Sequence, residues 1–367
     1  MTDVRREPHT TVCCAHPYFG FVCTPHAIID FSDRVPAEFG HGAVAAIDSR
    51  GFRNGEVPEA KPRDEFWVGL FGSSVAFGVP ATDNNRTIAA ALERALTAKH
   101  RAGKRVRVLN FALPGGQQPQ QYFVLALHRH LLDGVVTFDG VSELIVPAFY
   151  NEGHLPDQFP YRPYYEQLYG SGRSDEQICE SVLAERAVAT FRSRPAWQQR
   201  LFSSFHAREM ARRRATLASL SEGQPTFQSM FNSGRSASAA EAIETGAVNW
   251  ADYTTLMHDM CRSQALQALF IVHPVPERGK ALTASEQAHL RLEEEMVSLR
   301  GSGYDHVLTL AKELSDQGRP VVSFADVFAR CSESIYTDVT HFEDRGASIV
   351  ANRISEWICR TWTGFQW

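Results

Sequence analysis

Short apolar runs and helical patterns alternate over much of the chain. Residues 66–71 (FWVGLF) are apolar without a break, which is typical of a strand buried on both faces of a sheet. Residues 84–100 follow, with Ile88, Leu92 and Leu96 on one stripe at helical spacing, after Asn and Asp residues that favour a helix start. The pattern predicts a strand, a turn and a helix in succession, the unit from which parallel sheets are built.

The same alternation recurs further along the chain. We expect strands at 105–111 (RVRVLNF), 142–149 (SELIVPAF), 266–276 and 319–327, and helices at 117–134, 286–300 and 343–362. A capping box formed by Thr283 and Glu286 marks the beginning of one of these helices. Residues 64–151 and 264–367 therefore predict one α/β domain, a three-layer α/β/α sandwich around a five-stranded parallel, flavodoxin-like sheet.

Two segments lie outside this pattern. Residues 1–63 are rich in Pro, Gly and His and predict an irregular N-terminal arm, with short strands near 26–31 and 44–53. Residues 152–263 show several helical stretches and no clear strand. We expect them to form a mostly helical insertion that shapes the pocket.

Composition narrows the class of protein. The 367 residues are 44% hydrophobic and 22% charged, as in ordinary soluble globular proteins. A net charge of −5 provides no basic field for nucleic acid, so no nucleic-acid partner is expected. Nothing in the pattern indicates an oligomeric state.

The cysteines and the apolar runs bear on cofactors and compartment. The seven cysteines form neither a C-x-x-C pair nor the Cys/His spacing of a zinc site, which indicates buried thiols in a reducing compartment. No metal and no cofactor is therefore expected. The N-terminus lacks the apolar region of a secretory signal, and no run reaches the roughly 18 apolar residues of a spanning helix. These features predict a cytoplasmic protein without a membrane span.

Candidate chemistry gathers where the predicted strands end. In parallel α/β sheets the reactive groups lie beyond the carboxyl ends of the strands. Polar or glycine-containing segments stand at four such places: Gly72-Ser73-Ser74, Asn110 to Gly116, Phe149 to Glu152, and Tyr336 to His341. Together they contain a serine, a glycine turn, an asparagine and an Asp-x-x-His pair, which are the groups that acyl transfer through a serine requires.

Each group has a chemical role. Ser74 would be the nucleophile, exposed at a strand-to-helix turn, and its backbone N–H would point toward a developing oxyanion. Gly115 would add a second backbone N–H and Asn151 a side-chain amide to this oxyanion hole. His341 would take the serine proton as general base, and Asp338 would hold the imidazole and stabilise its cation.

These segments resemble the four motif blocks of the SGNH (GDSL) hydrolases, in the same order. The matching residues are Gly72-Ser73-Ser74 for the Gly-Asp-Ser block, Asn110 to Gly115 for N-x-x-x-P-G, Phe149-Tyr150-Asn151-Glu152 for G-x-N-D, and Asp338 to His341 for D-x-x-H. The resemblance covers about residues 64–151 and 265–360. It leaves out the arm and the insertion.

Three positions depart from the family pattern. Ser73 stands where the family usually has Asp, Phe149 where it has Gly, and Glu152 where it has Asp. They indicate a divergent branch, and Phe149 would narrow the space beside the oxyanion hole. With Tyr150 and His273, these residues are candidates for the substrate pocket.

The resemblance implies hydrolysis of a short acyl ester, such as an O-acetyl group on a sugar or another small molecule, through a covalent acyl-enzyme. Two alternatives stay open: an acyltransferase that uses the same residues, and a catalytically silent ligand-binding protein. Each residue alone also has a structural interpretation, with Ser74 as a turn serine, Gly115 as a chain reversal and His273 as a buried structural histidine.

Overall fold

The computed structural model describes residues 13–16, 18–99, 105–150, 237–290 and 294–363. The chain divides into two compact units, Met1–Arg162 with Ser236–Trp367, and Pro163–Arg235. The second unit lies entirely outside the described residues, and so does most of the predicted insertion.

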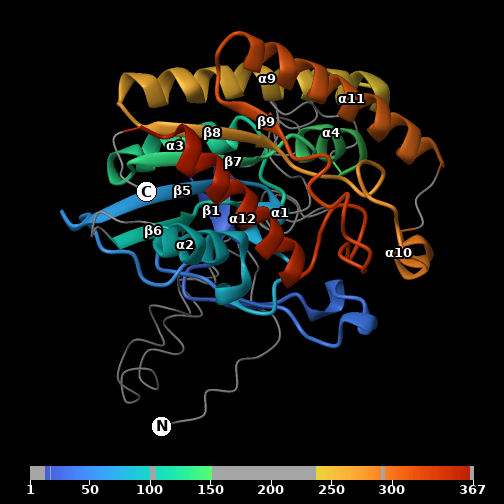
Figure 1. The fold of residues 1–367 in the computed structure, drawn as a ribbon, viewed down its shortest axis with the longest axis horizontal. Coiled ribbons are helices and arrows are strands. Elements are labelled where there is room, and N and C mark those ends of the chain that lie inside the picture. Colours follow the sequence, from blue (N-terminus) through green and yellow to red (C-terminus); the bar gives the residue numbers. More distant parts are fainter. Residues whose placement is uncertain (1–12, 17, 100–104, 151–236, 291–293, 364–367) are drawn as a thin grey trace, which may run out of the picture. The chain divides into compact units, whose positions relative to one another are not determined.

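A parallel five-stranded sheet forms the centre of the first unit, with strand order β6-β5-β7-β8-β9 (Figure 1). The strands are β5 (Glu65–Gly72), β6 (Arg105–Asn110), β7 (Gly134–Asp139), β8 (Gln267–Val272) and β9 (Val321–Ser323). The first strand in sequence, β5, pairs with both β6 and β7. This order and direction confirm the predicted flavodoxin-like sheet.

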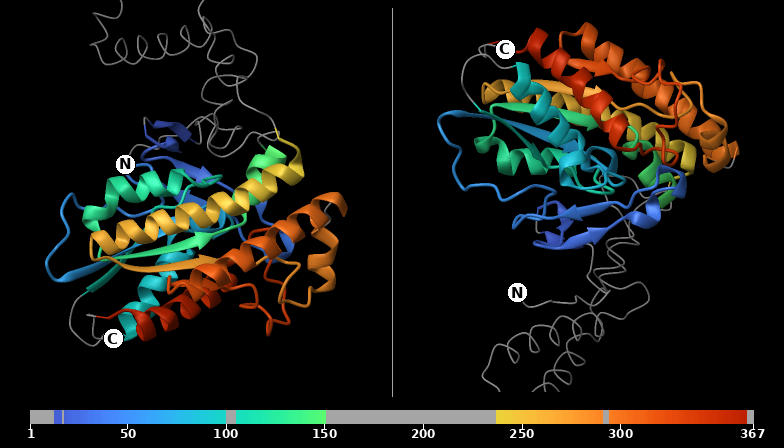
Figure 2. Two further views of the ribbon diagram at one scale, coloured as in Figure 1. Left: turned by 90° about the horizontal axis from the view of Figure 1, so that it is seen from above. Right: turned by 60° about the horizontal axis from the view of Figure 1, so that its bottom comes forward.

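Helices cover both faces of the sheet (Figures 1 and 2). One face carries α2 (Ile88–Lys99) and α12 (Asp344–Thr361), which contact each other. The other carries α3 (Gln120–His128), α9 (Ala239–Ser263) and α11 (Glu294–Asp316). The short helices are α1 (Ser74–Phe77), α4 (Ser142–Ile145) and α10 (Ala284–His289), with 3-10 turns at Ser32–Arg34, Ala37–Phe39, Asn84–Arg86 and Arg129–Leu131.

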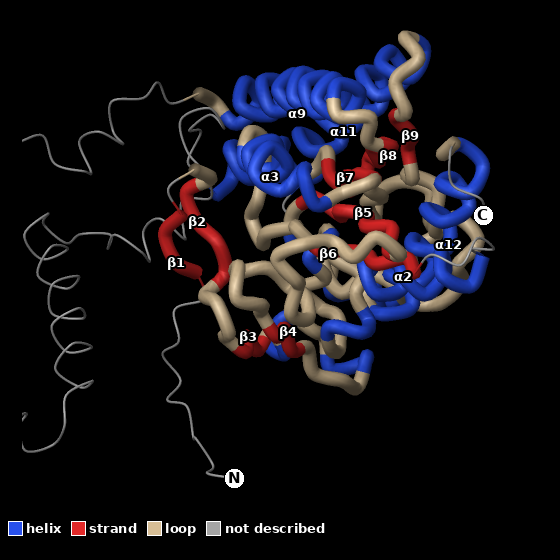
Figure 3. Tube along the Cα trace, turned by 90° about the vertical axis from the view of Figure 1, so that its left-hand side faces the viewer, coloured by secondary structure: helices blue, strands red, loops and turns tan. Residues whose placement is uncertain are grey.

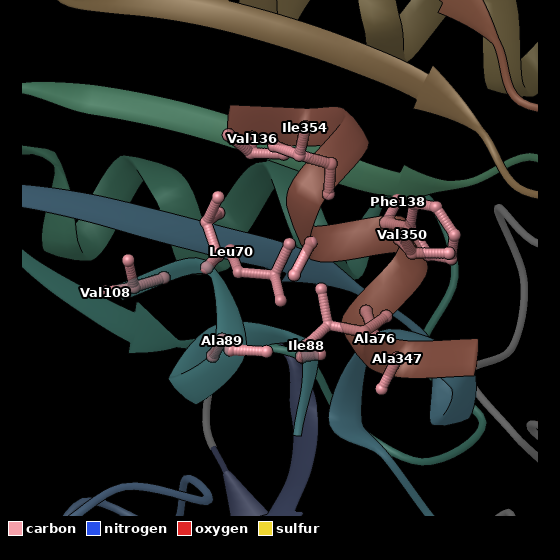
Figure 4. Close-up of a cluster of buried hydrophobic side chains, with 14 of the residues drawn as sticks. Leu70, Ala76, Ile88, Ala89, Val108, Val136, Phe138, Ala347, Val350 and Ile354 are labelled. Carbon is pink, nitrogen blue, oxygen red and sulfur yellow. The ribbon is translucent and has the colours of Figure 1, made fainter. Parts of the chain in front are cut away.

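A cluster of buried hydrophobic side chains lies between the sheet and the α2/α12 layer (Figure 4). Leu70 and Val136 point from adjacent strands toward Ile88 of α2 and toward Val350 and Ile354 of α12, and all five side chains are fully buried. Burying such a side chain contributes about 1.5–3 kcal/mol each. The alternation of these positions with residues that face α3, α9 and α11 explains why β5 is apolar throughout.

The third strand is not where the apolar pattern predicts it. Residues 142–149 form α4 and a π-helical turn, Val146–Tyr150, whereas the strand is Gly134–Asp139 (GVVTFD). Every residue of that strand is buried, and its Val135-Val136-Thr137 run is β-branched, as a central strand requires. Pro147 in the expected segment has no N–H for a ladder, which disfavours a central strand there.

Helix α9 falls within the segment that we assigned to the insertion. It packs against α11, α3 and α4 and connects β7 to β8 as a crossover helix of the sandwich. Residues 239–263 are therefore part of the α/β layers. The rest of the division into arm, domain and insertion stays a prediction.

The N-terminal arm contains two small antiparallel sheets outside the central one (Figure 3). They pair β1 (Cys13–His16) with β2 (Gly20–Cys23), and β3 (Ile28–Asp30) with β4 (Val44–Ala46). The two short strands predicted in the arm are confirmed as β3 and β4. Among the described helices of the chain, none has the length and apolar character needed to cross a bilayer.

Candidate active site

A tight turn at the carboxyl end of β5 presents Ser74. The strand ends at Gly72, and helix α1 begins at Ser74. Gly72 has φ +151°, and a Cβ there would lie 2.4 Å from the Phe138 carbonyl oxygen and 2.7 Å from the Ala76 Cβ. Only glycine fits this turn. The Ser74 side chain stays partly exposed.

Three predicted side chains meet in one hydrogen-bonded chain. The Ser74 Oγ lies 2.7 Å from His341 Nε2, and His341 Nδ1 lies 2.7 Å from Asp338 Oδ2. With the Nδ1 proton donated to Asp338, Nε2 carries the lone pair that accepts the Ser74 hydroxyl proton. The loop that bears the histidine thus turns a basic nitrogen toward the serine.

Asp338 is held as a carboxylate. Its Oδ1 accepts the backbone N–H groups of Thr340 (2.8 Å) and His341 (2.7 Å). Burial raises the pKa of Asp338, but the charge of His341 and these hydrogen bonds outweigh burial and hold the pKa well below its usual range. The ionised form is therefore the one that orients His341.

Two buried charged residues anchor this loop. Glu286 Oε1 accepts the backbone N–H groups of Ile335 (2.9 Å) and Tyr336 (3.0 Å), and the Arg300 guanidinium donates to the Val339 carbonyl (2.8 Å). Glu286 also closes the capping box of α10, which confirms the predicted helix start. These bonds fasten the chain on both sides of Asp338.

Two backbone donors are available near the serine. The Gly115 residue adopts φ +71°, and neither its N–H nor that of Ser74 has an acceptor within the described residues. We call residues 72–74 the nucleophile turn, after the role predicted for Ser74 from the sequence. The loop that bears Gly115 is bonded to this turn, because Leu113 donates its N–H to the Gly72 carbonyl (3.2 Å). The two loops therefore meet at the carboxyl end of β5.

The remaining predicted site residues fall into two groups. Asn151, Glu152 and the side chain of Tyr150 lie outside what the structure describes. Phe149 belongs to the π-helical turn and is half-buried, and Ser73 is buried with no partner for its hydroxyl among the described residues. Ser73 directly precedes Ser74 and stands at the N-cap position of α1.

His273 lies at the end of β8 and is 1% exposed. Its Nδ1 donates to the Pro274 carbonyl (3.0 Å), and its ring stacks on Phe138 at 5.6 Å between centroids. Burial, together with the charges of His341 and Arg300, lowers the pKa of His273 to about 4. The imidazole is therefore neutral near pH 7.

The shift of the third strand moves the third loop of the site. Directly after β7 the chain reads Gly140-Val141-Ser142-Glu143, which has the glycine and the acidic residue of the G-x-N-D pattern, with Ser142 in the asparagine position. This loop adjoins the nucleophile turn, since Phe138 and Gly72 are paired in the ladder. Sequence reasoning missed it because residues 134–139 were not recognised as the strand.

Within the described residues, no group of three or more His, Cys, Asp or Glu side chains is arranged to hold a metal ion.

No family model and no curated protein matches the chain. Among solved structures, an acetyl xylan esterase matches at 10% identity and a TM-score of 0.38, over 79% of this chain and 98% of that one. An extracellular lipase from Streptomyces rimosus matches at 12% identity and 0.39, over 79% and 98%. A carbohydrate acetylesterase from Sinorhizobium meliloti matches at 13% identity and 0.36, over 81% and 100%.

These three neighbours are esterases or lipases by name. At these identities and TM-scores, the function has to be argued from the geometry of the chain itself.

Proposed function

We propose that this protein hydrolyses carboxylic esters through a covalent intermediate on Ser74. The observation that carries the proposal is the hydrogen-bonded chain from Ser74 through His341 to Asp338, with 2.7 Å between the atoms of each pair. Such a chain on a partly exposed serine, at the carboxyl end of the sheet's first strand, has the geometry of an activated nucleophile.

The steps follow from these groups. Ser74 Oγ attacks the acyl carbon while His341 Nε2 takes its proton, and Asp338 stabilises the resulting imidazolium. The oxyanion accepts hydrogen bonds from the N–H groups of Ser74 and Gly115. When the tetrahedral species collapses, the alcohol leaves with the proton from His341, and the acyl group remains on Ser74. Water then repeats the sequence and releases the acid.

Two residues compete for the role of a third oxyanion donor. Asn151 is the residue predicted from the sequence, and Ser142 follows β7 at the spacing of the third motif. We favour Ser142, because the loop after β7 adjoins the nucleophile turn through the pairing of Phe138 with Gly72.

A fluorophosphonate probe tests the nucleophile directly. We expect one covalent adduct on the wild-type protein by intact mass, and no adduct on Ser74→Ala. Ser263→Ala is the control, since it removes an exposed serine hydroxyl at the C-terminal end of α9 and should retain the adduct. An adduct on a residue other than Ser74 would contradict the assignment, and an unlabelled wild type would favour the silent binding protein.

The acyl group and the acceptor stay predictions. Turnover of p-nitrophenyl acetate, butyrate and octanoate measures the preference for short chains. Adding alcohol or amine acceptors and analysing the products distinguishes the hydrolase from the acyltransferase, because a transferase converts the acyl-enzyme into a new ester or amide.

A further inference from the structure

The loop of residues 48–54 in the N-terminal arm contacts the C-terminal end of α1 through Arg53. This side chain is 2% exposed, and its guanidinium donates to the Gly78 carbonyl and to the carbonyls of Ala81 (3.2 Å) and Val44 (2.8 Å). Gly78 ends α1, the one-turn helix that begins at Ser74. Burial lowers the pKa of Arg53 to about 10, so the guanidinium is still cationic at neutral pH. Its positive charge interacts favourably with the carbonyl groups at the C-terminal end of α1.

The next residue, Asn54, contacts the other loop of the site. Its Oδ1 accepts the backbone N–H of Asn110 (2.7 Å), and its Nδ2 donates to the Asn110 carbonyl (3.1 Å). The same Nδ2 also donates to Asp48 Oδ2 (3.2 Å). Asn54 thus pairs with the last residue of β6 in the way that a neighbouring strand would.

Asn110 connects these two contacts. Its side chain is fully buried, donates to the carbonyls of Ala76 and Phe77 (both 3.3 Å), and accepts the N–H of Ala112 (3.1 Å). One end of the network therefore holds the carbonyls of α1, and the other holds the beginning of the loop that leads to Gly115.

We propose that Arg53 and Asn54 are positioning residues that set the distance between the Ser74 and Gly115 backbone N–H groups. The two groups come from different loops, and hydrogen bonds from the arm reach both loops. Oxyanion stabilisation depends on preorganised donors, and a misplacement of about 1 Å costs on the order of 100-fold in rate. The proposal rests on the proposed function of Ser74.

The test measures how fast the fluorophosphonate labels Ser74, with the maximal rate separated from probe affinity. We expect Asn54→Ala and Arg53→Gln to lower the maximal labelling rate by about 10- to 100-fold with less than about 2-fold change in affinity. Arg53→Lys keeps the charge without the planar fork, so it should fall between wild type and Arg53→Gln.

Phe52→Leu is the matched control. It loosens the same loop by reducing the contact of this buried ring with Phe111, and it leaves the polar network in place. We expect its labelling rate to stay within about 2-fold of wild type at a comparable loss of stability. Equal losses of rate in Phe52→Leu and Asn54→Ala would show that the loop acts only through general stability, and would overturn the proposal.

Hydrogen exchange gives a readout that does not need activity. In Asn54→Ala the Asn110 amide loses its acceptor, and exchange should rise both in residues 110–116 and in residues 74–78. If the wild type is not labelled at all, the proposed function fails, while this exchange pattern still measures the coupling. If exchange rises at Asn110 alone and Ser74 is labelled at the wild-type rate, the positioning role is wrong. Should Asn54→Ala fail to fold, Arg53→Lys decides by the same two measurements.

Discussion

Two groups of carboxylates lie near the carboxyl ends of the strands, and their charges differ. Asp338 accepts two backbone N–H groups and the imidazole of His341, which keep its pKa low. Asp139, the last residue of β7, and Glu143 of α4 are fully buried, whereas Asp338 is partly exposed. Burial raises the pKa of both Asp139 and Glu143, and the proximity of Asp139 raises that of Glu143 further. The same side-chain chemistry is therefore ionised in one place and driven toward the neutral form in the other.

The difference lies in what faces each carboxylate. Asp338 faces His341, which gains positive charge in the reaction that we propose. The second pair is surrounded by neutral groups: Trp250 Nε1 donates to Asp139 Oδ1 (2.8 Å), and Gln121 Nε2 (3.2 Å) and the Gly140 N–H (3.1 Å) donate to Glu143. Neutral donors compensate less of the cost of burying a charge than a cation does. Burial alone thus does not identify a catalytic acid.

Removing the charge from each site is the sharpest way to test this contrast. Asp338→Asn keeps the shape but loses the carboxylate that orients His341, so kcat should fall by about 10⁴-fold. Asp139→Asn can keep the bond from Trp250 through its amide oxygen, so kcat should stay within about 3-fold of wild type. Steady-state turnover of p-nitrophenyl acetate measures both.

Circular dichroism and thermal melting of both variants show whether each is folded. The contrast fails if the Asp139 variant loses activity as the Asp338 variant does while remaining folded. It also fails if Asp338→Asn retains more than about a tenth of wild-type turnover.

Ser142, which lies between Asp139 and Glu143 in the sequence, is the residue for the next test. If Ser142 is the third oxyanion donor, Ser142→Ala should lower kcat by about 10²-fold with little change in KM, and Asn151→Ala should leave kcat nearly unchanged. The reverse result would restore the role of Asn151 that was predicted from the sequence. Losses in both variants would mean that the two loops act together.

The sheet and its first turn could be predicted because their signals are local. The apolar run 66–71 followed by a glycine and serines is enough to predict a strand that ends in a turn. The pairing of Asp338 with His341 is also local, since the two lie three residues apart. The structure brings both to Ser74, across 267 residues of sequence.

The hydrophobic pattern did not predict two features: the position of the third strand, for which two neighbouring segments competed, and the hydrogen bonds between residues far apart in the sequence. Residues 134–139 and 142–149 are both apolar, and the buried β-branched run was passed over because Gly134 was taken as the end of a helix. The bonds of Asn54 to Asn110 join residues 56 positions apart. A contact between residues so far apart forms only in the folded protein, and no periodic pattern in the sequence indicates it.

The smallest expected effect is on the pH dependence of the free energy of unfolding. Asp139 and Glu143 contribute to it with one sign, and His273 contributes with the other. The pKa of His273 is about 4 in the folded protein and near 6.5 in the unfolded chain, so the unfolded chain binds more protons between these values, and stability falls as pH decreases from 6.5. For Asp139 and Glu143 the folded state binds more protons, so stability falls as pH rises above the ordinary carboxyl range. The two contributions have opposite signs and partly cancel in mildly acid solution.

Two variants should separate these contributions. His273→Asn, which keeps an amide donor near the Pro274 carbonyl, removes a pH-dependent cost on the order of 3 kcal/mol, so its stability should fall more steeply than that of wild type as pH rises from about 4.5 to about 6.5. Asp139→Asn removes one of the two opposing carboxyl contributions and leaves that of Glu143, so its stability should fall less steeply than that of wild type over the same interval. Urea denaturation at several pH values gives the two slopes. If both variants keep the wild-type slope, neither buried group titrates differently on unfolding, and the contrast between the ionised Asp338 and the neutral pair loses its physical basis.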